Sequence, residues 1–293
     1  MKPLVVGLGE ILWDLLPEGK ELGGAPANFA YHADRLGAKG IVVSSVGDDA
    51  LGREILATLQ SLALSGEHVR VQGEHPTGTV SVDLNEQGMP RYTIHEGVAW
   101  DFIPSAPELD RLARQAHAVC VGSLAQRHDV SRRTVHRFLD ATAPSCWRVF
   151  DLNLRQRFYT RDIIETTLKK TRLFKLNDEE WPVLADMLGV SAGLPGGLAA
   201  LRERFRLDVI ALTRGAEGSL ICYDAGIHAL AGRKVKVVDT VGAGDAFTAA
   251  LLMGIMAGRP VPEAHEHAAR LAAYVCTRRG ATPDIPPEPE SCD

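Results

Sequence analysis

Short apolar segments rich in β-branched residues alternate along this chain with longer amphipathic segments. The short ones have the composition of buried strands and cover residues 41–46, 118–121, 148–151 and 209–212. The long ones space their apolar side chains as amphipathic helices do and cover residues 27–36, 51–62, 132–141 and 198–205. This alternation predicts an α/β fold in which helices cover a mainly parallel central sheet, with ligands beyond the carboxyl ends of the strands.

Two segments do not follow this rhythm. Residues 79–84 and 91–95 alternate polar and apolar side chains with period two around Glu86, Gln87 and Gly88, which predicts a β-hairpin. A hairpin alone is only marginally stable, and residues 11–16 could supply a further strand. We interpret these pieces, at about 10–22 and 77–98, as a small β-sheet lid over a binding site. The alternative is an ordinary solvated hairpin.

Composition limits the function that this fold can carry. The 293 residues, 45% of them hydrophobic, suffice for one large α/β domain or two smaller ones. The formal charge is −5 without a long Lys/Arg block, so we expect a small-molecule substrate and no nucleic-acid partner. No Cys-x-x-Cys pair or signal-peptide pattern occurs, and the longest apolar run, around 249–257, is too short to span a bilayer. These features predict a cytoplasmic protein with no membrane partner.

The most informative stretch is 239–245, which reads Asp-Thr-Val-Gly-Ala-Gly-Asp before an apolar helical pattern at 246–257. Gly242, Ala243 and Gly244 have almost no side chain, so their N–H groups can approach an anion closely at the start of the helix. Asp245 stands where a carboxylate could take a proton from an attacking hydroxyl group. The alternative is that Asp245 is a helix N-cap, but a cap does not require the run of small residues. The pattern favours phosphoryl transfer.

A second cluster lies near the N-terminus. Gly23 and Gly24 permit a tight turn with exposed N–H groups, and Asn28 in the following helical segment offers a donor and an acceptor to a sugar hydroxyl. Asp14 can accept two hydroxyl hydrogen bonds. Taken singly, these residues could be an ordinary loop, a polar helix position and a solvated turn.

Together the two clusters resemble the signatures of the ribokinase-type (PfkB) carbohydrate kinases. Residues 23–28 are similar to the N-terminal signature and residues 239–247 to the C-terminal one, and intervening segments also match. Within the family the similarity is closest to fructokinases, through segments 7–10 with Asp14, 22–28, 122–124 and 151–155. The resemblance implies one ribokinase-like kinase domain over residues 1–293, a three-layer α/β/α fold with the β-lid inserted in it.

The resemblance also implies an activity, the ATP-dependent transfer of the γ-phosphoryl group to a sugar hydroxymethyl group. Asp245 would be the general base, and the amides of Gly242, Ala243 and Gly244 would form the anion hole. The positions that match sugar-binding residues are Asp14, Gly24, Asn28, Asn153 and Arg155. We favour D-fructose, giving fructose 6-phosphate, with 2-keto-3-deoxygluconate as the next candidate and ribose or a nucleoside as further alternatives. Arg155, Arg157 and Arg91 are candidates to bind a charged sugar, or else solvated strand-end residues.

Nucleotide and metal positions follow from further matches to the family. The matching nucleotide-binding residues are Asn177, Thr213, Gly215, Gly218 and Gly244. Glu180 and Asn177 match a site for hydrated Mg²⁺, and Asp239 and Val241, with the turn 279–281, match a site for K⁺ bound by backbone oxygens. Residues 213–218 could instead be a simple turn between strands, and Asn177 with Glu180 has the spacing of a capping box. Pro182 argues that the helix begins two or more residues later and that Asn177 is not a simple cap.

Other classes of protein fit less well. Gly7 and Gly9 after a strand are reminiscent of an NAD-dependent oxidoreductase, but Leu12 replaces the next expected glycine. The chain lacks a P-loop motif, and His265 and His267 lack the spacing of a zinc-protease helix. A non-catalytic sugar-binding protein would not need Asp245. Finally, the exposed edges of a β-lid predict a homodimer that pairs through it.

Overall fold

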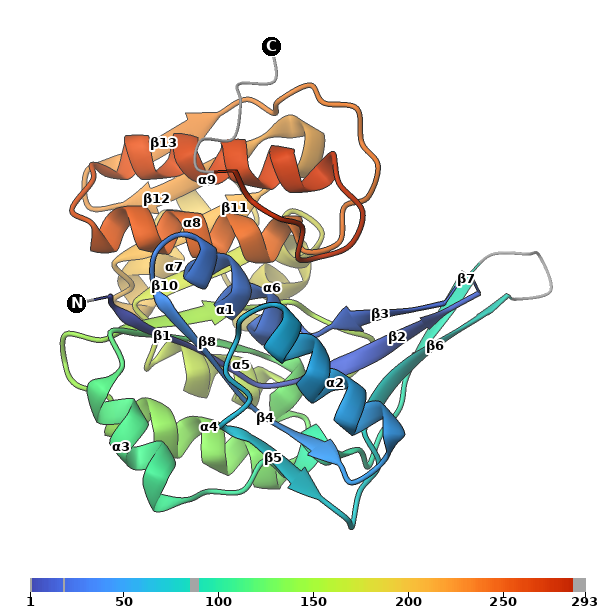
Figure 1. Ribbon diagram of the computed structural model, residues 1–293. Coiled ribbons are helices and arrows are strands. Elements are labelled where there is room, and N and C mark those ends of the chain that lie inside the picture. The colour runs from blue at the N-terminus through green and yellow to red at the C-terminus, as the bar shows by residue number, and fades with distance from the viewer. Residues whose placement is uncertain (1, 18, 85–89, 287–293) are drawn as a thin grey trace.

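A large twisted sheet forms the centre of the molecule (Figure 1). The computed structural model describes residues 2–17, 19–84 and 90–286. Within these residues the sheet has nine strands, in the order β13-β12-β11-β10-β9-β8-β1-β4-β5, and only β12 and β13 at one edge pair antiparallel. The strands are β1 (Leu4–Leu8), β4 (Lys39–Gly47), β5 (Val69–Gln72), β8 (Ala118–Gly122), β9 (Trp147–Asp151), β10 (Leu173–Asn177), β11 (Val209–Thr213), β12 (Ser219–Tyr223) and β13 (Gly226–Leu230). The predicted mainly parallel sheet is confirmed.

Helices cover both faces of this sheet and complete the three-layer α/β/α fold. One face carries α1 (Ala25–Arg35), α2 (Ala50–Ser61), α8 (Ala243–Met256) and α9 (Val261–Cys276). The other carries α3 (Pro107–Gln115), α4 (Asp129–Ala141), α5 (Arg161–Leu168), α6 (Glu180–Leu188) and α7 (Gly196–Phe205). Short 3₁₀ turns are η1 (Ala99–Phe102), η2 (Leu124–Gln126) and η3 (Gly215–Glu217). No helix in the described part of the chain is long and apolar enough to cross a membrane.

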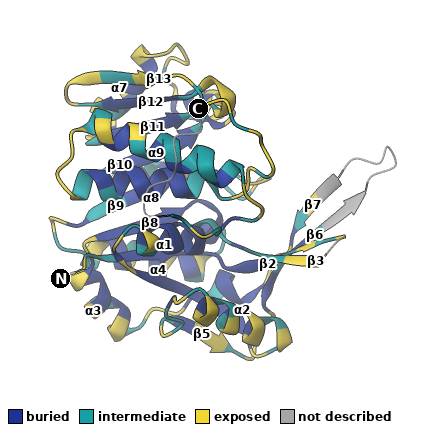
Figure 2. Ribbon diagram, turned by 45° about the horizontal axis from the view of Figure 1, so that its top comes forward, coloured by how far each residue is buried: buried dark blue, intermediate teal, exposed yellow. Residues whose placement is uncertain are grey.

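The core divides between the two faces of the large sheet, and α1 and α8 are both largely buried. Figure 2 shows that α1 and α8 are largely buried, whereas the outer sides of α2 and α3 are exposed. Helix α8 packs against both α1 and α9 and is apolar on nearly all sides, which is the pattern of a helix enclosed by others. Its N-terminus is therefore held firmly in place.

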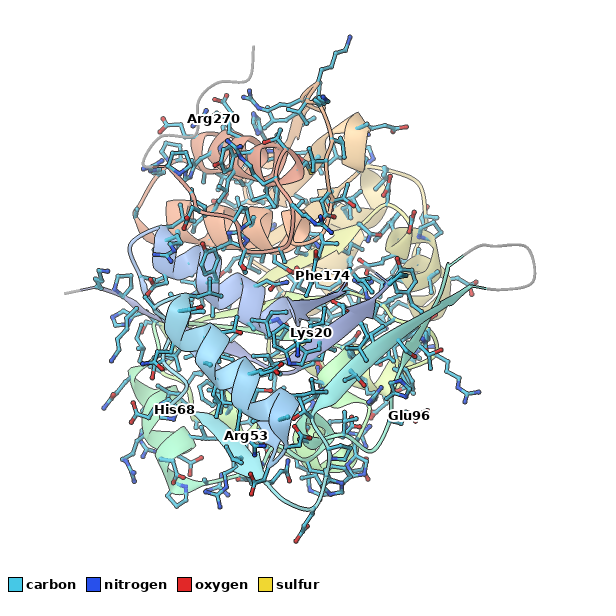
Figure 3. The ribbon with its side chains drawn as sticks, turned by 45° about the vertical axis from the view of Figure 1, so that its right-hand side comes forward. Lys20, Arg53, His68, Glu96, Phe174 and Arg270 are labelled. Atoms are coloured by element: carbon cyan, nitrogen blue, oxygen red, sulfur yellow. The ribbon has the colours of Figure 1, made fainter. Side chains whose placement is uncertain are left out.

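A second, smaller sheet projects from the body of the molecule (Figure 1). Its strands lie in the order β3-β2-β6-β7, with bounds β2 (Leu12–Leu16), β3 (Gly19–Gly23), β6 (Gly78–Leu84) and β7 (Pro90–Ile94). The predicted hairpin is confirmed as the antiparallel pair β6 and β7, and its turn at 86–88 lies outside the described residues. The predicted further strand is β2, which pairs parallel with β6. Lys20 on β3, labelled in Figure 3, has its Nζ 5.1 Å from the centroid of the Trp13 ring on β2.

The order of strands shows where a ligand can bind. The chain passes from β1 to β4 and β5 on one side and returns to β8 on the other, so the strand order reverses at β1. Crevices at such a reversal, beyond the carboxyl ends of the strands, are the usual ligand sites of α/β sheets. Glu10, Asp151 and Asn177 all lie at this edge, at or just after the ends of β1, β9 and β10.

Candidate active site

The N-terminus of α8 presents backbone N–H groups at this edge. Gly242 is the N-cap and has φ 76°, the left-handed region that favours glycine. A Cβ atom at this position would lie 2.5 Å from the carbonyl oxygen of Ala281. Ala243 N–H donates to Thr240 O over 3.3 Å, but among the described residues Gly242 N–H and Gly244 N–H have no hydrogen-bond acceptor. The helix start therefore offers at least these two amides to an anion.

Asp245 lies in the first turn of α8 and is not its cap, because Gly242 occupies that position. Its Oδ2 accepts a 2.9 Å hydrogen bond from Asn28 Nδ2. The carboxyl group is half-buried, and burial raises its pKa to about 7, with a further rise from Asp151 that the Asn28 hydrogen bond partly offsets. A carboxylate with a pKa near 7 is suited to accept a proton at neutral pH.

Asn28 reaches Asp245 because of the way α1 begins. Gly24 is the N-cap of α1 with φ 120°, and a Cβ atom there would lie 2.4 Å from the carbonyl oxygen of Glu10. Only glycine therefore lets the chain pass this close to the end of β1. Asn28 is buried, and among the described residues its Oδ1 has no hydrogen-bond donor. The structure thus joins the motifs of Asn28 and Asp245, which are 217 residues apart in sequence. It leaves Asn28 Oδ1 beside them as an acceptor for a ligand hydroxyl.

Two further acidic side chains, Asp14 and Glu10, have raised pKa values. Burial and the neighbouring Glu21 raise the pKa of Asp14 to about 6. Burial raises the pKa of Glu10 to about 7, and the negative charge of Asp245 adds to this effect. The positive charge of Arg155 partly offsets these rises and that of Asp245. Arg155 itself is exposed, and its Nη1 donates to Leu154 O over 3.1 Å.

Asn153, a further sugar-side candidate, lies in the loop that follows β9. Its backbone has φ 45°, which asparagine tolerates better than most residues. Its carbonyl oxygen is 3.4 Å from the hydroxyl of Ser123, so the contact is with the main chain of Asn153. The loop thereby rests against the segment after β8, one of the segments that resemble fructokinases.

Asn177 and Glu180 make the two reciprocal hydrogen bonds of a capping box, although Asn177 is not the N-cap of the helix that follows. Glu180 N–H donates to Asn177 Oδ1 over 2.8 Å, and Asn177 N–H donates to Glu180 Oε2 over 2.9 Å. Helix α6 begins at Glu180 with Glu179 as its N-cap, which confirms both the predicted later start and the prediction that Asn177 is not a simple cap. The two hydrogen bonds span the turn residues 178 and 179, and Pro182 stays in the first turn of the helix.

Glu180 is also the residue that fits a magnesium ion best. It is buried, and its Oε1 accepts a 2.7 Å hydrogen bond from Leu154 N–H. Each carboxylate oxygen retains a lone pair for a water molecule. Within the described residues no group of three or more His, Cys, Asp or Glu side chains could hold a metal. One carboxylate that acts through water fits Mg²⁺, which is commonly held by few carboxylates and the phosphates of a substrate.

The segment 213–218 does connect two strands, as its simpler interpretation held. It joins β11 to its antiparallel neighbour β12 through η3. Gly215 and Gly218 have φ 49° and 93°, and a Cβ atom on Gly218 would lie 2.0 Å from Leu230 O. Thr213 pairs in register with Asn177 at the same sheet edge. A nucleotide-binding role for this turn stays a prediction.

The segment proposed for potassium is held together by Asp239. Its Oδ1 accepts from Val241 N–H and its Oδ2 from Gly280 N–H, both over 3.0 Å. His32 Nε2 lies 2.9 Å from the carbonyl oxygen of Ala281. The turn 279–281 therefore lies beside residues 239–241, which lead into α8. Potassium binding there stays a prediction.

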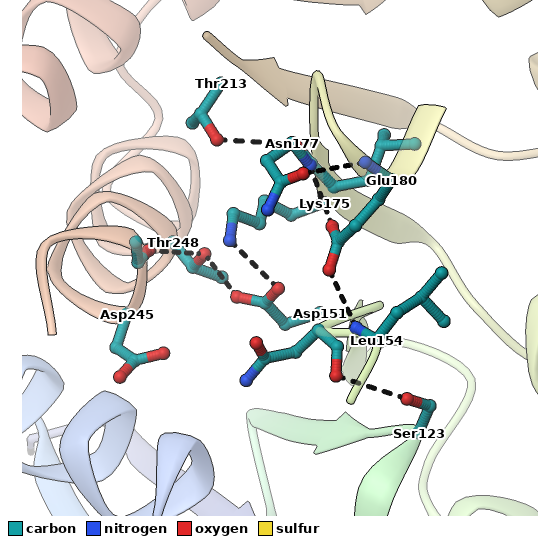
Figure 4. Close-up of polar contacts among 12 residues, drawn as sticks. Ser123, Asp151, Leu154, Lys175, Asn177, Glu180, Thr213, Asp245 and Thr248 are labelled. Carbon is teal, nitrogen blue, oxygen red and sulfur yellow. Dashed lines mark hydrogen bonds and ion pairs between the residues drawn. The ribbon is translucent and has the colours of Figure 1, made fainter. Parts of the chain in front are cut away.

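The sequence alone assigned no role to Lys175 or Thr248, which contact Asp151 at the start of α8 (Figure 4). Lys175 Nζ lies 3.0 Å from Asp151 Oδ1, and the Thr248 hydroxyl lies 3.1 Å from Asp151 Oδ2. A lysine inside the apolar run 173–176 is a signal that could have been used, because a buried charge requires a partner. The partner itself depends on which strands are neighbours.

Comparison with known proteins agrees with this geometry. The model of the pfkB family carbohydrate kinases matches residues 18–288. The chain belongs to the pfkB family. It is 30% identical to a fructokinase of Escherichia coli over 296 residues and 32% identical to a fructokinase of Salmonella typhimurium over 297 residues, each time with 95% of both chains covered. The crystal structure of an uncharacterized sugar kinase from Pyrococcus horikoshii in complex with ATP has a TM-score of 0.81 and 27% identity, over 95% of this chain and 94% of that one.

Membership of the pfkB family confirms the resemblance and the ribokinase-like fold. It makes the protein a sugar kinase and removes the support for the oxidoreductase alternative that Gly7 and Gly9 raised. The relatives named above are fructokinases.

Proposed function

We propose that this pfkB family kinase transfers the γ-phosphoryl group of ATP to a hydroxymethyl group of D-fructose and forms fructose 6-phosphate. The observation that carries the proposal is the 2.9 Å hydrogen bond between Asn28 and Asp245, which joins a sugar-side motif to an anion-binding helix start. The fructokinase names of relatives at about 30% identity support the choice of sugar. The ATP complex of the Pyrococcus kinase supports the choice of donor.

In the proposed reaction Asp245 is the general base. It takes the proton of the hydroxymethyl group while that oxygen forms a bond to the γ-phosphorus and the bond from this phosphorus to the bridging oxygen of ATP breaks. ADP leaves with the bridging oxygen. The amides of Gly242, Ala243 and Gly244 face the charge that develops on the transferring group, with Gly242 and Gly244 best placed because their N–H groups have no acceptor among the described residues.

The nucleotide would lie along the carboxyl ends of β10 and β11. Asn177, Thr213, Gly215, Gly218 and Gly244 are the residues that we assign to it. Glu180, with Asn177, would hold hydrated Mg²⁺, which neutralises phosphate charge when bound. Asp239 and Val241 remain our candidates for a K⁺ site.

The charges around the sugar site support a neutral sugar. Asp14, Gly24, Asn28, Asn153 and Arg155 are the residues that we assign to it. The charge of one arginine, Arg155, acts on three carboxyl groups, those of Asp14, Glu10 and Asp245, so little positive charge is left for an acidic sugar. Arg155 and Arg157 are both exposed, and the side chain of Arg91 lies outside the described residues. This balance favours fructose over the ketoacid sugar 2-keto-3-deoxygluconate.

The choice of sugar can be tested with one assay. ADP release by the purified kinase with ATP and Mg²⁺ should be fastest with D-fructose, because little positive charge is left for an acidic sugar. The panel includes 2-keto-3-deoxygluconate, ribose and a nucleoside, each with and without K⁺. A higher kcat/KM for 2-keto-3-deoxygluconate would show that the charge argument is wrong.

The pH dependence of the rate should report the ionisation of Asp245. The pKa of this carboxyl is raised to about 7, and a general base must be deprotonated to act. We therefore expect kcat/KM to fall as the pH falls through about 7, about tenfold per pH unit below it. Initial rates between pH 5 and 9 measure this, and a rate that stays level down to pH 5 would contradict the role.

The small sheet also predicts an oligomeric state. Its edge strands β3 and β7 have no outer neighbour among the described strands, and Tyr92 on β7 is 56% exposed. We propose a homodimer formed through this sheet. Light scattering should give twice the chain mass, and Tyr92→Glu should reduce it. Val183→Glu, at an exposed apolar position on α6, is the matched control, and a monomeric wild type would refute the dimer.

A further inference from the structure

A buried ion pair lies directly beneath the proposed transfer site. Lys175 on β10 and Asp151 on β9 are register partners on neighbouring parallel strands, so their side chains leave the sheet on the same face. Lys175 Nζ lies 3.0 Å from Asp151 Oδ1, and the two side chains are only 8% and 5% exposed. Figure 4 shows both pointing toward α8.

The ammonium group of Lys175 lies against the anion-binding turn itself. A Cβ atom built on Gly244 would be 2.9 Å from Lys175 Nζ, so the absence of a side chain at Gly244 makes room for this charge. On the other side of the pair, the Thr248 hydroxyl lies 3.1 Å from Asp151 Oδ2 and 2.9 Å from Gly244 O. The pair is therefore tied to the first turn of α8, which carries Asp245.

The positive charge of Lys175 acts on carboxyl groups at both ends of the proposed site. It acts on Glu180 at the nucleotide end and on Asp245 at the sugar end. The charged groups that act on Asp245 are Asp151 on β9, Lys175 on β10, Arg155 after β9 and Glu10 after β1. Among the described residues Nζ has one acceptor, Asp151, although an ammonium group carries three N–H donors.

We propose that Lys175 is a positioning residue of the phosphoryl-transfer site: held by Asp151, it keeps one positive charge against Gly244, between Asp245 and Glu180. This inference rests on the proposed role of Asp245. The charge fixes the first turn of α8 and offsets the carboxylates that would otherwise repel the phosphates of the nucleotide.

The competing explanation is that the pair only stabilises the fold. Buried ion pairs contribute little net stability, because the desolvation of two charges offsets their attraction, whereas removal of one partner leaves a costly unpaired charge. Stability alone would accept an uncharged pair of similar size at these positions. If the reaction needs the charge, an uncharged pair restores stability but not turnover. The two explanations therefore predict different turnover for the double variant.

The test compares Lys175→Met, Asp151→Asn and the double variant Lys175→Met/Asp151→Asn. We expect Lys175→Met to lower the melting temperature, since it leaves Asp151 unpaired, and the double variant to regain most of that loss. We expect kcat in the double variant to stay about 30-fold or more below the wild type, because the charge is still missing. A double variant that regains both stability and turnover would overturn the proposal.

A second measurement decides the matter if the double variant folds poorly. Lys175→Met removes a positive charge that lowers the pKa of Asp245, so the acid limb of kcat/KM should move to higher pH, whereas Asp151→Asn keeps the ammonium group and should move the limb to lower pH. A limb that does not move would overturn the proposal. Arg172→Gln is the control, because it breaks a half-exposed pair with Asp208 just before β10, at the opposite end of the strand, and it should leave the limb in place.

These results can be separated from a failure of the proposed function. All rates are measured with whichever sugar releases ADP fastest, so a wrong choice of sugar does not affect the comparison. If Asp245→Asn keeps normal turnover, the role of Asp245 is wrong. If Asp245→Asn is inactive while the double variant is fully active, only the role of Lys175 is wrong.

Discussion

Asp245→Asn should lower kcat by about 100-fold or more while ATP binding is largely kept, because the substitution removes the proton acceptor without changing the size of the side chain. The amide oxygen can still accept the hydrogen bond from Asn28, so the contact between α1 and α8 should persist. ADP-release kinetics measure kcat, and calorimetric titration with a non-hydrolysable ATP analogue measures nucleotide affinity.

Asp224→Asn is the matched control for this variant. Asp224 lies exposed in the turn between β12 and β13, where the one donor to its Oδ1 in the described part of the chain is Ala225 N–H. The same chemical change there should leave kcat within about twofold of the wild type. If Asp245→Asn were as active as Asp224→Asn, the general base would have to be a different group.

Gly242→Ala should lower kcat by about 100-fold through the backbone alone. The residue has φ 76°, and its new Cβ atom would lie 2.5 to 2.8 Å from three atoms of Ala281. The chain must shift to relieve this overlap, and a shift of about 1 Å in a positioned group can cost about 100-fold in rate. The substitution should also lower the stability by about 1 to 3 kcal/mol because of the backbone conformation. Enzyme kinetics and thermal unfolding measure the two effects.

Gly258→Ala separates the two causes. Gly258 also has φ 76° but lies just beyond the C-terminal end of α8, and apart from its chain neighbours no atom of the described residues lies within 4 Å of a Cβ atom built on it. This variant should lose stability through its backbone conformation and keep its kcat. If Gly242→Ala retained wild-type kcat, the amides of this turn would not be part of the anion hole.

Periodicity and local turn chemistry predicted most of the regular elements. The run 41–46 lies within β4, and the small-residue turn before 246 does begin α8. These features depend on neighbours in sequence, so the sequence displays them directly. The argument from Pro182 held as well, because α6 begins at Glu180 with Glu179 as its N-cap, while the capping-box spacing of Asn177 and Glu180 does produce two reciprocal hydrogen bonds.

Contacts between distant segments depend on strand order, which periodicity does not contain. The approach of Asn28 to Asp245 was expected only through resemblance to a family, and the structure supplies the 2.9 Å contact. The sequence shows that Lys175 must have a partner, but the identity of Asp151 follows from the pairing of β9 with β10. The pKa values near 7 likewise require knowledge of burial.

The most direct test of the central claim follows both products of one reaction. Wild-type protein, ATP, Mg²⁺ and D-fructose are incubated together, and ADP and sugar phosphate are quantified by mass spectrometry, beside a parallel reaction with Asp245→Asn. We predict equal amounts of ADP and fructose 6-phosphate from the wild type and about 100-fold less of both from the variant. ADP without any sugar phosphate, or equal product from both proteins, would contradict the account.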